Sequence, residues 1–331
     1  MVCPPQRDTV NDKQSLTHAI VVVEKPFTIT SKEAAHLIAT QKETGQILTV
    51  FQNRRYDSDF RTLRQVLDSG KLGEITEFQN HYDVDNPVWV QKWTSPDLEP
   101  GEGMLYGLGT HNLDQTLLLY GKPKSVTAFT RALRRESKTD DSFTVVLQYG
   151  GEKKNLICTV KTTIVSTLPM EKQLKFLVRG RDGTFIKVSS ISPSFSTTQR
   201  KEILTYRTTQ HGEDPQIDHL FAPIPVTSPD FGVEPTSYHG EIFTKQQFDK
   251  CQTQAGSAVA PSQQGVEVSG LWSGVYPSAK GSYADFYVDV ANAILGKGEL
   301  KVRPEESAMN IRCIELARES AETGRTVEWS D

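Results

Sequence analysis

Two short stretches of the sequence carry residues that could do chemistry together. The first is Val21-Val22-Val23-Glu24-Lys25-Pro26, in which three β-branched residues indicate a short buried strand and the proline ends its hydrogen-bond ladder. Open α/β sheets bind ligands in the crevice beyond the carboxyl ends of their strands. Lys25 therefore stands where such a sheet presents a functional group. Taken alone, the stretch favours the alternative interpretation, a surface lysine at a strand end.

The second stretch covers residues 103–115 and reads Gly-Met-Leu-Tyr-Gly-Leu-Gly-Thr-His-Asn-Leu-Asp-Gln. Its glycines let the backbone approach a ligand or another element closely. His111 and Asp114 are three residues apart, so on a helix they share a face, and histidine is the natural proton donor or acceptor near neutral pH. The alternative is a helix capped by Thr110 with a partly buried histidine.

The elements after Lys25 follow an α/β pattern. Thr30 and Glu33 match a capping box at the start of a helix, and Gly45 is a typical residue to close it. Strands and helices that alternate with short connections are typical of α/β folds. The predicted order is a helix over 30–44, a buried strand over 47–51, and a helix that is capped by Asp57 or Ser58 and ends before Gly70.

From residue 125 the hydrophobic pattern changes to a period of two, and successive strands without helices between them indicate an antiparallel sheet. Asp182-Gly183 predicts a two-residue hairpin turn. Residues 189–275 are rich in Ser, Thr, Gln, Gly and Pro and are predicted to be mostly surface loops. Residues 104–120 are predicted to be a loop that enters an apolar helix, and further helices are predicted over 283–295 and 304–323. The predicted strands are 74–82, 125–130, 142–149, 156–165, 173–178 and 184–188.

Composition narrows the class of protein. The 331 residues are 37% hydrophobic and 24% charged, which is ordinary for a globular protein of about two domains. The formal net charge of −4 gives no basic surface for nucleic acid or an anionic membrane. No apolar run has the length of a membrane span, and residues 1–20 lack the pattern of a signal peptide. The scattered cysteines predict a reduced, cytoplasmic compartment, and no metal site is predicted, since the histidines and acids of 211–219 match no motif.

Together the two stretches resemble the Gfo/Idh/MocA family of NAD(P)-dependent sugar and polyol oxidoreductases. Glu24-Lys25-Pro26 matches the E-K-P motif of that family, and residues 103–114 are similar to its glycine-rich G-x-L-x-D-x-G-x-H-x-x-D segment. Residues 53–57 look like its N-R-R-[FYW]-D strand end, while 302–306 and 324–327 look like its last helix and strand. The resemblance covers nearly all of residues 20–166 and 280–329, in order.

The resemblance implies an α/β fold, α+β overall, with an incomplete Rossmann-like domain at residues 1–29. A mainly antiparallel-sheet α/β domain of the family's C-terminal type would follow at 30–329, and the helix over 304–323 is expected to pack back on the N-terminal part. A homo-oligomer would form through the C-terminal sheet, and the partner would be a small-molecule substrate rather than nucleic acid or a membrane.

The function that the resemblance implies is hydride transfer between NADP or NAD and a sugar, polyol, dihydrodiol or secondary-metabolite carbonyl or alcohol. Lys25 would orient the substrate and His111 would act as the acid or base. The residues expected at the cofactor are Glu24, Lys25 and Pro26, and those expected at the substrate are Asn53, Arg54, Tyr56 and Asp114.

Two departures from the family pattern open alternatives. No G-x-G-x-x-G loop, which holds a pyrophosphate at a helix N-terminus, precedes Val21, so the chain is expected to be N-terminally truncated. Gly107 replaces the aspartate expected four residues before His111, and the loss of a carboxylate should weaken proton transfer. The alternatives to an active enzyme are a catalytically impaired pseudoenzyme that acts as a binding or regulatory protein, and a decayed copy that folds poorly.

Overall fold

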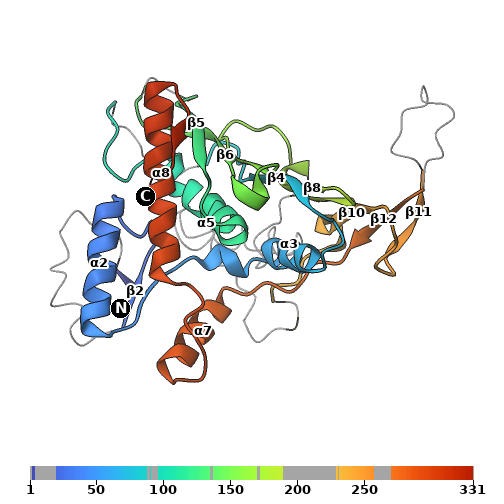
Figure 1. The fold of residues 1–331 in the computed structure, drawn as a ribbon, viewed down its shortest axis with the longest axis horizontal. Helices are drawn as coiled ribbons and strands as arrows, with labels where there is room; N and C mark the ends of the chain where they lie inside the picture. Colours follow the sequence, from blue (N-terminus) through green and yellow to red (C-terminus); the bar gives the residue numbers. More distant parts are fainter. Residues whose placement is uncertain are drawn as a thin grey trace, which may run out of the picture.

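The computed structural model describes residues 2–3, 20–87, 90, 96–134, 137–169, 172–188, 229, 231–256 and 270–330. In these residues the chain forms a small sheet and a large sheet with helices packed against them (Figure 1). The small sheet has the order β1 (Val2–Cys3), β2 (Val21–Val23) and β3 (Leu48–Val50), and all of its pairings are parallel. The strand predicted before Lys25 is therefore present, between two parallel neighbours.

Helix α2 (Ser31–Thr44) connects β2 to β3 and begins as the sequence predicts. The Thr30 side chain accepts from the backbone of Glu33, the Glu33 side chain accepts from the backbone of Thr30, and Gly45 ends the helix with a left-handed φ of 67°. The buried face of α2 packs on α8 (Pro304–Thr323), the two helices lying side by side in Figure 1. Glu315 of α8 accepts from the backbone and hydroxyl of Ser31, each at 2.7 Å.

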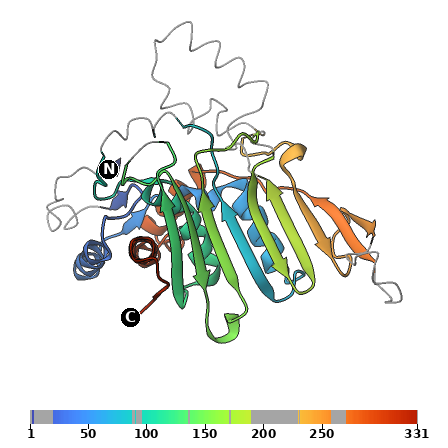
Figure 2. The same cartoon turned by 90° about the horizontal axis from the view of Figure 1, so that it is seen from above.

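The large sheet has ten strands in the order β11-β12-β10-β9-β8-β4-β7-β6-β5-β13, which Figure 2 shows side by side. Its only parallel pairing among the described residues joins β4 to β7; every other pairing is antiparallel. The predicted antiparallel sheet is confirmed. Its strands are β4 (Ile75–His81), β5 (Ser125–Arg131), β6 (Ser142–Gln148), β7 (Ile157–Thr162), β8 (Leu174–Gly180), β9 (Gly183–Val188), β10 (Gly240–Thr244), β11 (Gln252–Ala255), β12 (Leu271–Tyr276) and β13 (Val327–Glu328).

Helices cover one face of this large sheet, and the main core lies beneath them (Figure 2). Phe78, Phe143 and Phe176 of the sheet are fully buried, and each buried phenylalanine contributes roughly 1.5–3 kcal/mol to folding. The remaining helices are α3 (Ser58–Asp68), α4 (Met104–Gly107), α5 (Gly109–Tyr120), α7 (Ala284–Ile294) and the short 3₁₀ helices η1 (Asn53–Tyr56), η3 (Gly151–Lys153) and η5 (Thr236–Tyr238).

Two details of the sequence prediction are wrong. The loops predicted over 189–275 contain β10, β11 and β12. Strand β10 pairs with β9, β12 with β10 and β11 with β12, and this series of pairings supplies hydrogen bonds that a polar composition does not reveal. The link between β8 and β9 is Arg181-Asp182, and Gly183 already belongs to β9. A Cβ on Gly183 would lie 2.7 Å from the carbonyl oxygen of Phe243, so this glycine permits close packing and not a turn.

The predicted division of the chain at residue 29 stays a prediction. In the structure β2 precedes that position and β3 follows it, yet the two strands pair in one sheet. Residues 211–219, considered above as metal ligands, lie outside the described residues. Within the described ranges, no helix combines the length and apolar character needed to cross a bilayer.

Candidate functional site

Lys25 lies directly beyond the carboxyl end of β2, as the sequence predicts. Its ammonium donates to the carbonyl oxygen of Gly107 at 2.9 Å, which joins two stretches 82 residues apart. Burial and the charge of Arg54 lower the pKa of Lys25 to about 8, while Glu24 opposes the shift. Because that pKa is above 7, the amine is mostly protonated at neutral pH and remains a hydrogen-bond donor.

His111 lies in the first turn of α5, close to Lys25. Its side chain is buried, and its Nδ1 atom has no hydrogen-bond partner among the described residues. Burial, followed by the charges of Lys25, Arg54 and Lys175, holds the pKa of His111 well below its usual 6.5. The imidazole is therefore neutral at pH 7, which is the form that accepts a proton.

The backbone before His111 is fixed by Asp140. Its carboxylate accepts from the backbone of Leu105 at 2.8 Å and from the guanidinium of Arg318 at 2.7 Å, and its carbonyl accepts from the backbone of Met104. Gly103 has a φ of 98°, and a Cβ there would collide with the Asp140 carboxylate. Glycine at 103 is thus required by conformation and by space.

Arg54, which belongs to η1, lies near Lys25 and His111, since its charge lowers the pKa of both. Its guanidinium lies 5.4 Å from the ring centres of both Tyr82 and Tyr283, and it donates to the Tyr283 hydroxyl. It also faces Asp57 at 3.4 Å. Burial raises the pKa of Asp57 to about 7 although Arg54 opposes the shift. Arg54 is therefore held by two aromatic rings and a weakly acidic carboxyl.

The structure brings Lys25, His111 and Arg54 together but gives two other predicted residues different partners. The Tyr56 hydroxyl donates to Asp289 of α7 at 2.8 Å. Both carboxylate oxygens of Asp114 accept from Arg55, at 2.6 and 2.7 Å. Substrate binding by these two residues stays a prediction, as does the role of Asn53, which is buried in η1.

Sequence reasoning missed three residues of this neighbourhood. Tyr82 follows β4, and its ring centre lies 6.5 Å from that of His111. Tyr283 contacts Arg54, and Lys175 of β8 lies 4.5 Å from the Tyr82 ring centre. Lys175 is visible in the sequence as a charged residue inside an apolar strand. The sequence does not show, however, towards which face of the sheet its side chain points.

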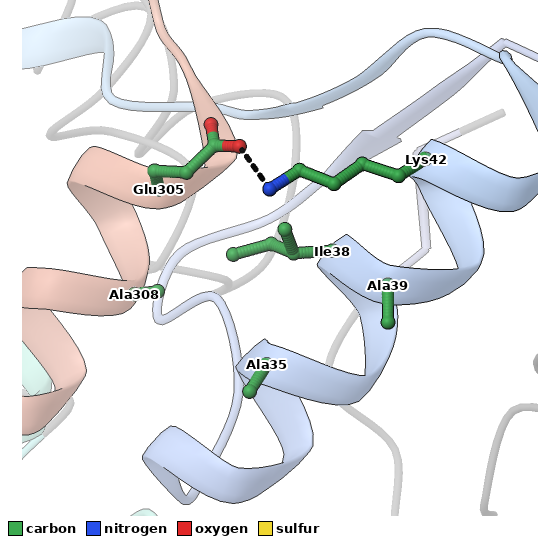
Figure 3. A pocket seen from close by; sticks show the side chains of 6 residues that line it. All are labelled: Ala35, Ile38, Ala39, Lys42, Glu305 and Ala308. Carbon is green, nitrogen blue, oxygen red and sulfur yellow. Dashed lines mark ion pairs between the residues drawn. The ribbon is translucent and has the colours of Figure 1, made fainter.

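A separate groove lies between α2 and α8 and contains none of these residues (Figure 3). Lys42 and Glu305 face each other across it, with 3.6 Å between their charged atoms. Its other lining residues are Ala35, Ile38, Ala39 and Ala308. In the part of the chain that the structure describes, no group of three or more His, Cys, Asp or Glu side chains could hold a metal ion.

Comparison with known proteins matches residues 60–186 to the GFO/IDH/MocA C-terminal domain. Over 307 residues the chain is 30% identical to the scyllo-inositol 2-dehydrogenase (NADP(+)) IolW of Bacillus subtilis, covering 93% of this chain and 71% of that protein. Over 167 residues it is 42% identical to the uncharacterized oxidoreductase YhhX of Escherichia coli, covering 50% of this chain and only 45% of YhhX.

Solved structures give the same relationship. The structure of an oxidoreductase from Bacillus cereus aligns with a TM-score of 0.69 at 26% identity, and the alignment covers 94% of this chain and 73% of that one. The YPO2259 protein of Yersinia pestis aligns with a TM-score of 0.73, also at 26% identity, over 100% of this chain and 79% of the other.

Proposed function

The chain belongs to the Gfo/Idh/MocA family of oxidoreductases, and on that premise we propose that it interconverts an alcohol and a carbonyl with NAD(P) as the hydride carrier. The substrate would be a sugar, a polyol, a dihydrodiol or a related metabolite. The observation that carries the proposal is that Lys25 and His111 lie close together, so that the charge of Lys25 helps to lower the pKa of His111. Lys25 donates to Gly107, four residues before His111 in the chain, and the Nδ1 of His111 is buried without a partner in the described residues.

The residues present fit the nicotinamide end of the cofactor. Glu24, Lys25 and Pro26 lie beyond the end of a parallel strand, where α/β sheets bind ligands. The Nδ1 of His111, which has no partner among the described residues, could form a hydrogen bond with a polar group of a ligand. Among the described residues none forms the glycine-rich turn that holds a pyrophosphate, so the fit concerns the nicotinamide end alone. When bound, the nicotinamide supplies or takes the hydride.

The protein side chains would handle the proton and the oxygen. The Lys25 ammonium would donate to the reacting oxygen and stabilise the negative charge that develops on it. Neutral His111 would accept the hydroxyl proton in oxidation and return it in reduction. Burial, helped by the charges of Lys25 and Arg54, keeps His111 neutral, so the base is available without prior deprotonation.

The test is a pH series of polyol oxidation by the purified chain with NAD⁺ and with NADP⁺, using scyllo-inositol, D-apiose and D-glucose. We expect polyol-dependent reduction of the cofactor that falls as pH rises through about 8, because Lys25 then loses its proton. No acidic fall is expected near pH 6.5, since the pKa of His111 is well below that value. An absence of cofactor binding by fluorescence titration would contradict the proposal.

Gly107 favours a second candidate, a pseudoenzyme that binds a metabolite or regulates a partner. Where the family motif has a carboxylate, Lys25 here has a backbone carbonyl as its acceptor, and a neutral carbonyl stabilises an ammonium less than a carboxylate does. The two candidates separate in the same assay: the pseudoenzyme would bind a polyol, as seen by calorimetry, without turning it over.

We also propose a homo-oligomer through the face of the large sheet that lies opposite the described helices. Phe129 is 60% exposed and Ile157 is 46% exposed, and their pairing with Thr144 and Gln148 of β6 places both on one face. Sedimentation equilibrium should show a dimer or larger species, and Phe129→Lys should shift it toward monomer. A monomeric wild-type chain at micromolar concentration would contradict this.

A further inference from the structure

Lys175 reaches the candidate site because β8 carries a bulge. Strand β8 pairs with β9 through Leu174 with Val188 and then Phe176 with Lys187, so Lys175 is one residue inserted between paired positions. A bulge of this kind redirects a side chain and is common beside active sites. The Lys175 ammonium donates to the side-chain amide oxygen (Oδ1) of Asn80 at 3.2 Å. Asn80 in turn donates to Gln115 of α5, so Lys175 points to the helix-covered face.

The ring of Tyr82 links Lys175 to the proposed reacting groups. The Lys175 ammonium lies 4.5 Å from its centre and the Arg54 guanidinium lies 5.4 Å from it, while the His111 ring is 6.5 Å away. Lys175 is only 3% exposed, and its charge is among those that lower the pKa of His111. A second buried amine therefore belongs to the same neighbourhood as Lys25.

The hydrogen-bonding capacity of Lys175 exceeds its use within the described residues. An ammonium has three N–H donors, and the acceptor that the described part of the chain offers is Asn80. A purely structural role as counter-charge to Asp57 and Asp59 would use the charge of Lys175 but not its other donors. Asp57 and Asp59 oppose the charges of Arg54 and Lys175, so a neutral ligand would meet a cluster that carries groups of both signs.

We propose that Lys175 is a substrate-positioning residue that donates to a second oxygen of a neutral, polyhydroxylated substrate. The proposal rests on the proposed function and deepens it, because it favours sugars and polyols over substrates with few oxygens. Lys25 and His111 would hold the reacting oxygen while Lys175 holds another, so the molecule is oriented at two points.

The first test uses the wild-type chain labelled with ¹³C and ¹⁵N in lysine and titrated with scyllo-inositol, D-apiose and D-glucose. We expect the side-chain resonances of Lys25 and Lys175 to shift on binding, while Lys187, buried against Glu234, stays in place. If Lys25 shifts and Lys175 does not, the Lys175 proposal is wrong and the proposed function stands. If no polyol moves either resonance, both are wrong.

The second test compares Lys175→Met with Lys153→Met, which removes a lysine that donates to Tyr120 far from the site. We expect the dissociation constant for the polyol, measured by calorimetry, to rise about 10- to 100-fold in Lys175→Met and to be unchanged in Lys153→Met. Turnover should show a higher KM with little change in kcat, and Lys175→Arg should recover part of the affinity. A folded Lys175→Met variant with a lower Tm and wild-type affinity would mean that the role is structural only.

Discussion

Replacing His111 with asparagine should lower kcat for polyol oxidation by about 10²- to 10⁴-fold, the usual contribution of a positioned acid or base. The side chain is buried in the first turn of α5, and its pKa lies well below 6.5. It is therefore unprotonated at pH 7, in the form that can accept a proton, a role that an amide cannot take. Substrate affinity should change much less than kcat, because asparagine keeps a hydrogen-bonding group at that place.

Lys25→Met should cause a loss of similar size and should also remove the fall in activity above pH 8. The matched controls are His36→Asn on the exposed side of α2 and Lys153→Met, which make the same chemical changes outside the site. Steady-state kinetics across pH 5–10 on all four variants provide the measurement, with thermal unfolding to show that each is folded. If His111→Asn retains more than about a tenth of wild-type kcat, His111 is not the acid or base.

The sequence predicted those parts of the site that local patterns determine. Lys25 could be placed because three β-branched residues and a proline mark the end of a strand, and His111 because a glycine-rich segment leads into an apolar helix. Both signals depend on a few adjacent residues. Helix α2 was predicted to within one residue at its start for the same reason, since Thr30, Glu33 and Gly45 specify its two ends.

Contacts between distant residues were not predictable in this way. Lys175 reaches Tyr82 only because a bulge inserts it between two paired positions, and one sequence does not reveal strand register. The same limit hid Arg55, which the sequence presents as the neighbour of Arg54 in a polar stretch. Its partners, Asp114 and Glu306, are 59 and 251 residues away along the chain. Strands β10 to β12 were missed because long-range pairing overrides their loop-like composition.

Arg55→Met should lower the free energy of unfolding by about 3–5 kcal/mol, the cost of leaving a buried charge without its partner. Arg55 makes a bidentate pair with Asp114 at 2.6 and 2.7 Å and a third bond to Glu306 at 2.6 Å. The side chains of Arg55 and Asp114 are 6% and 2% exposed. Methionine fills a similar volume, so little cavity forms. The lost free energy of unfolding therefore reflects mainly the carboxylates of Asp114 and Glu306 that no longer have a partner.

Arg61→Met is the matched control for this prediction. Arg61 pairs with Asp285 at the same 2.6 Å, but the two side chains are 29% and 43% exposed, and a pair so open to water contributes about 0–1 kcal/mol. Urea unfolding of both variants gives the comparison, and equal losses would show that the Arg55 cluster is no more desolvated than the surface pair.

Adding Asp114→Asn to Arg55→Met should recover part of the stability, because asparagine replaces the buried carboxylate with a neutral amide. Asp114 lies one helical turn after His111 and Arg55 adjoins Arg54, so this cluster holds α5, η1 and α8 in the arrangement that the proposed chemistry requires.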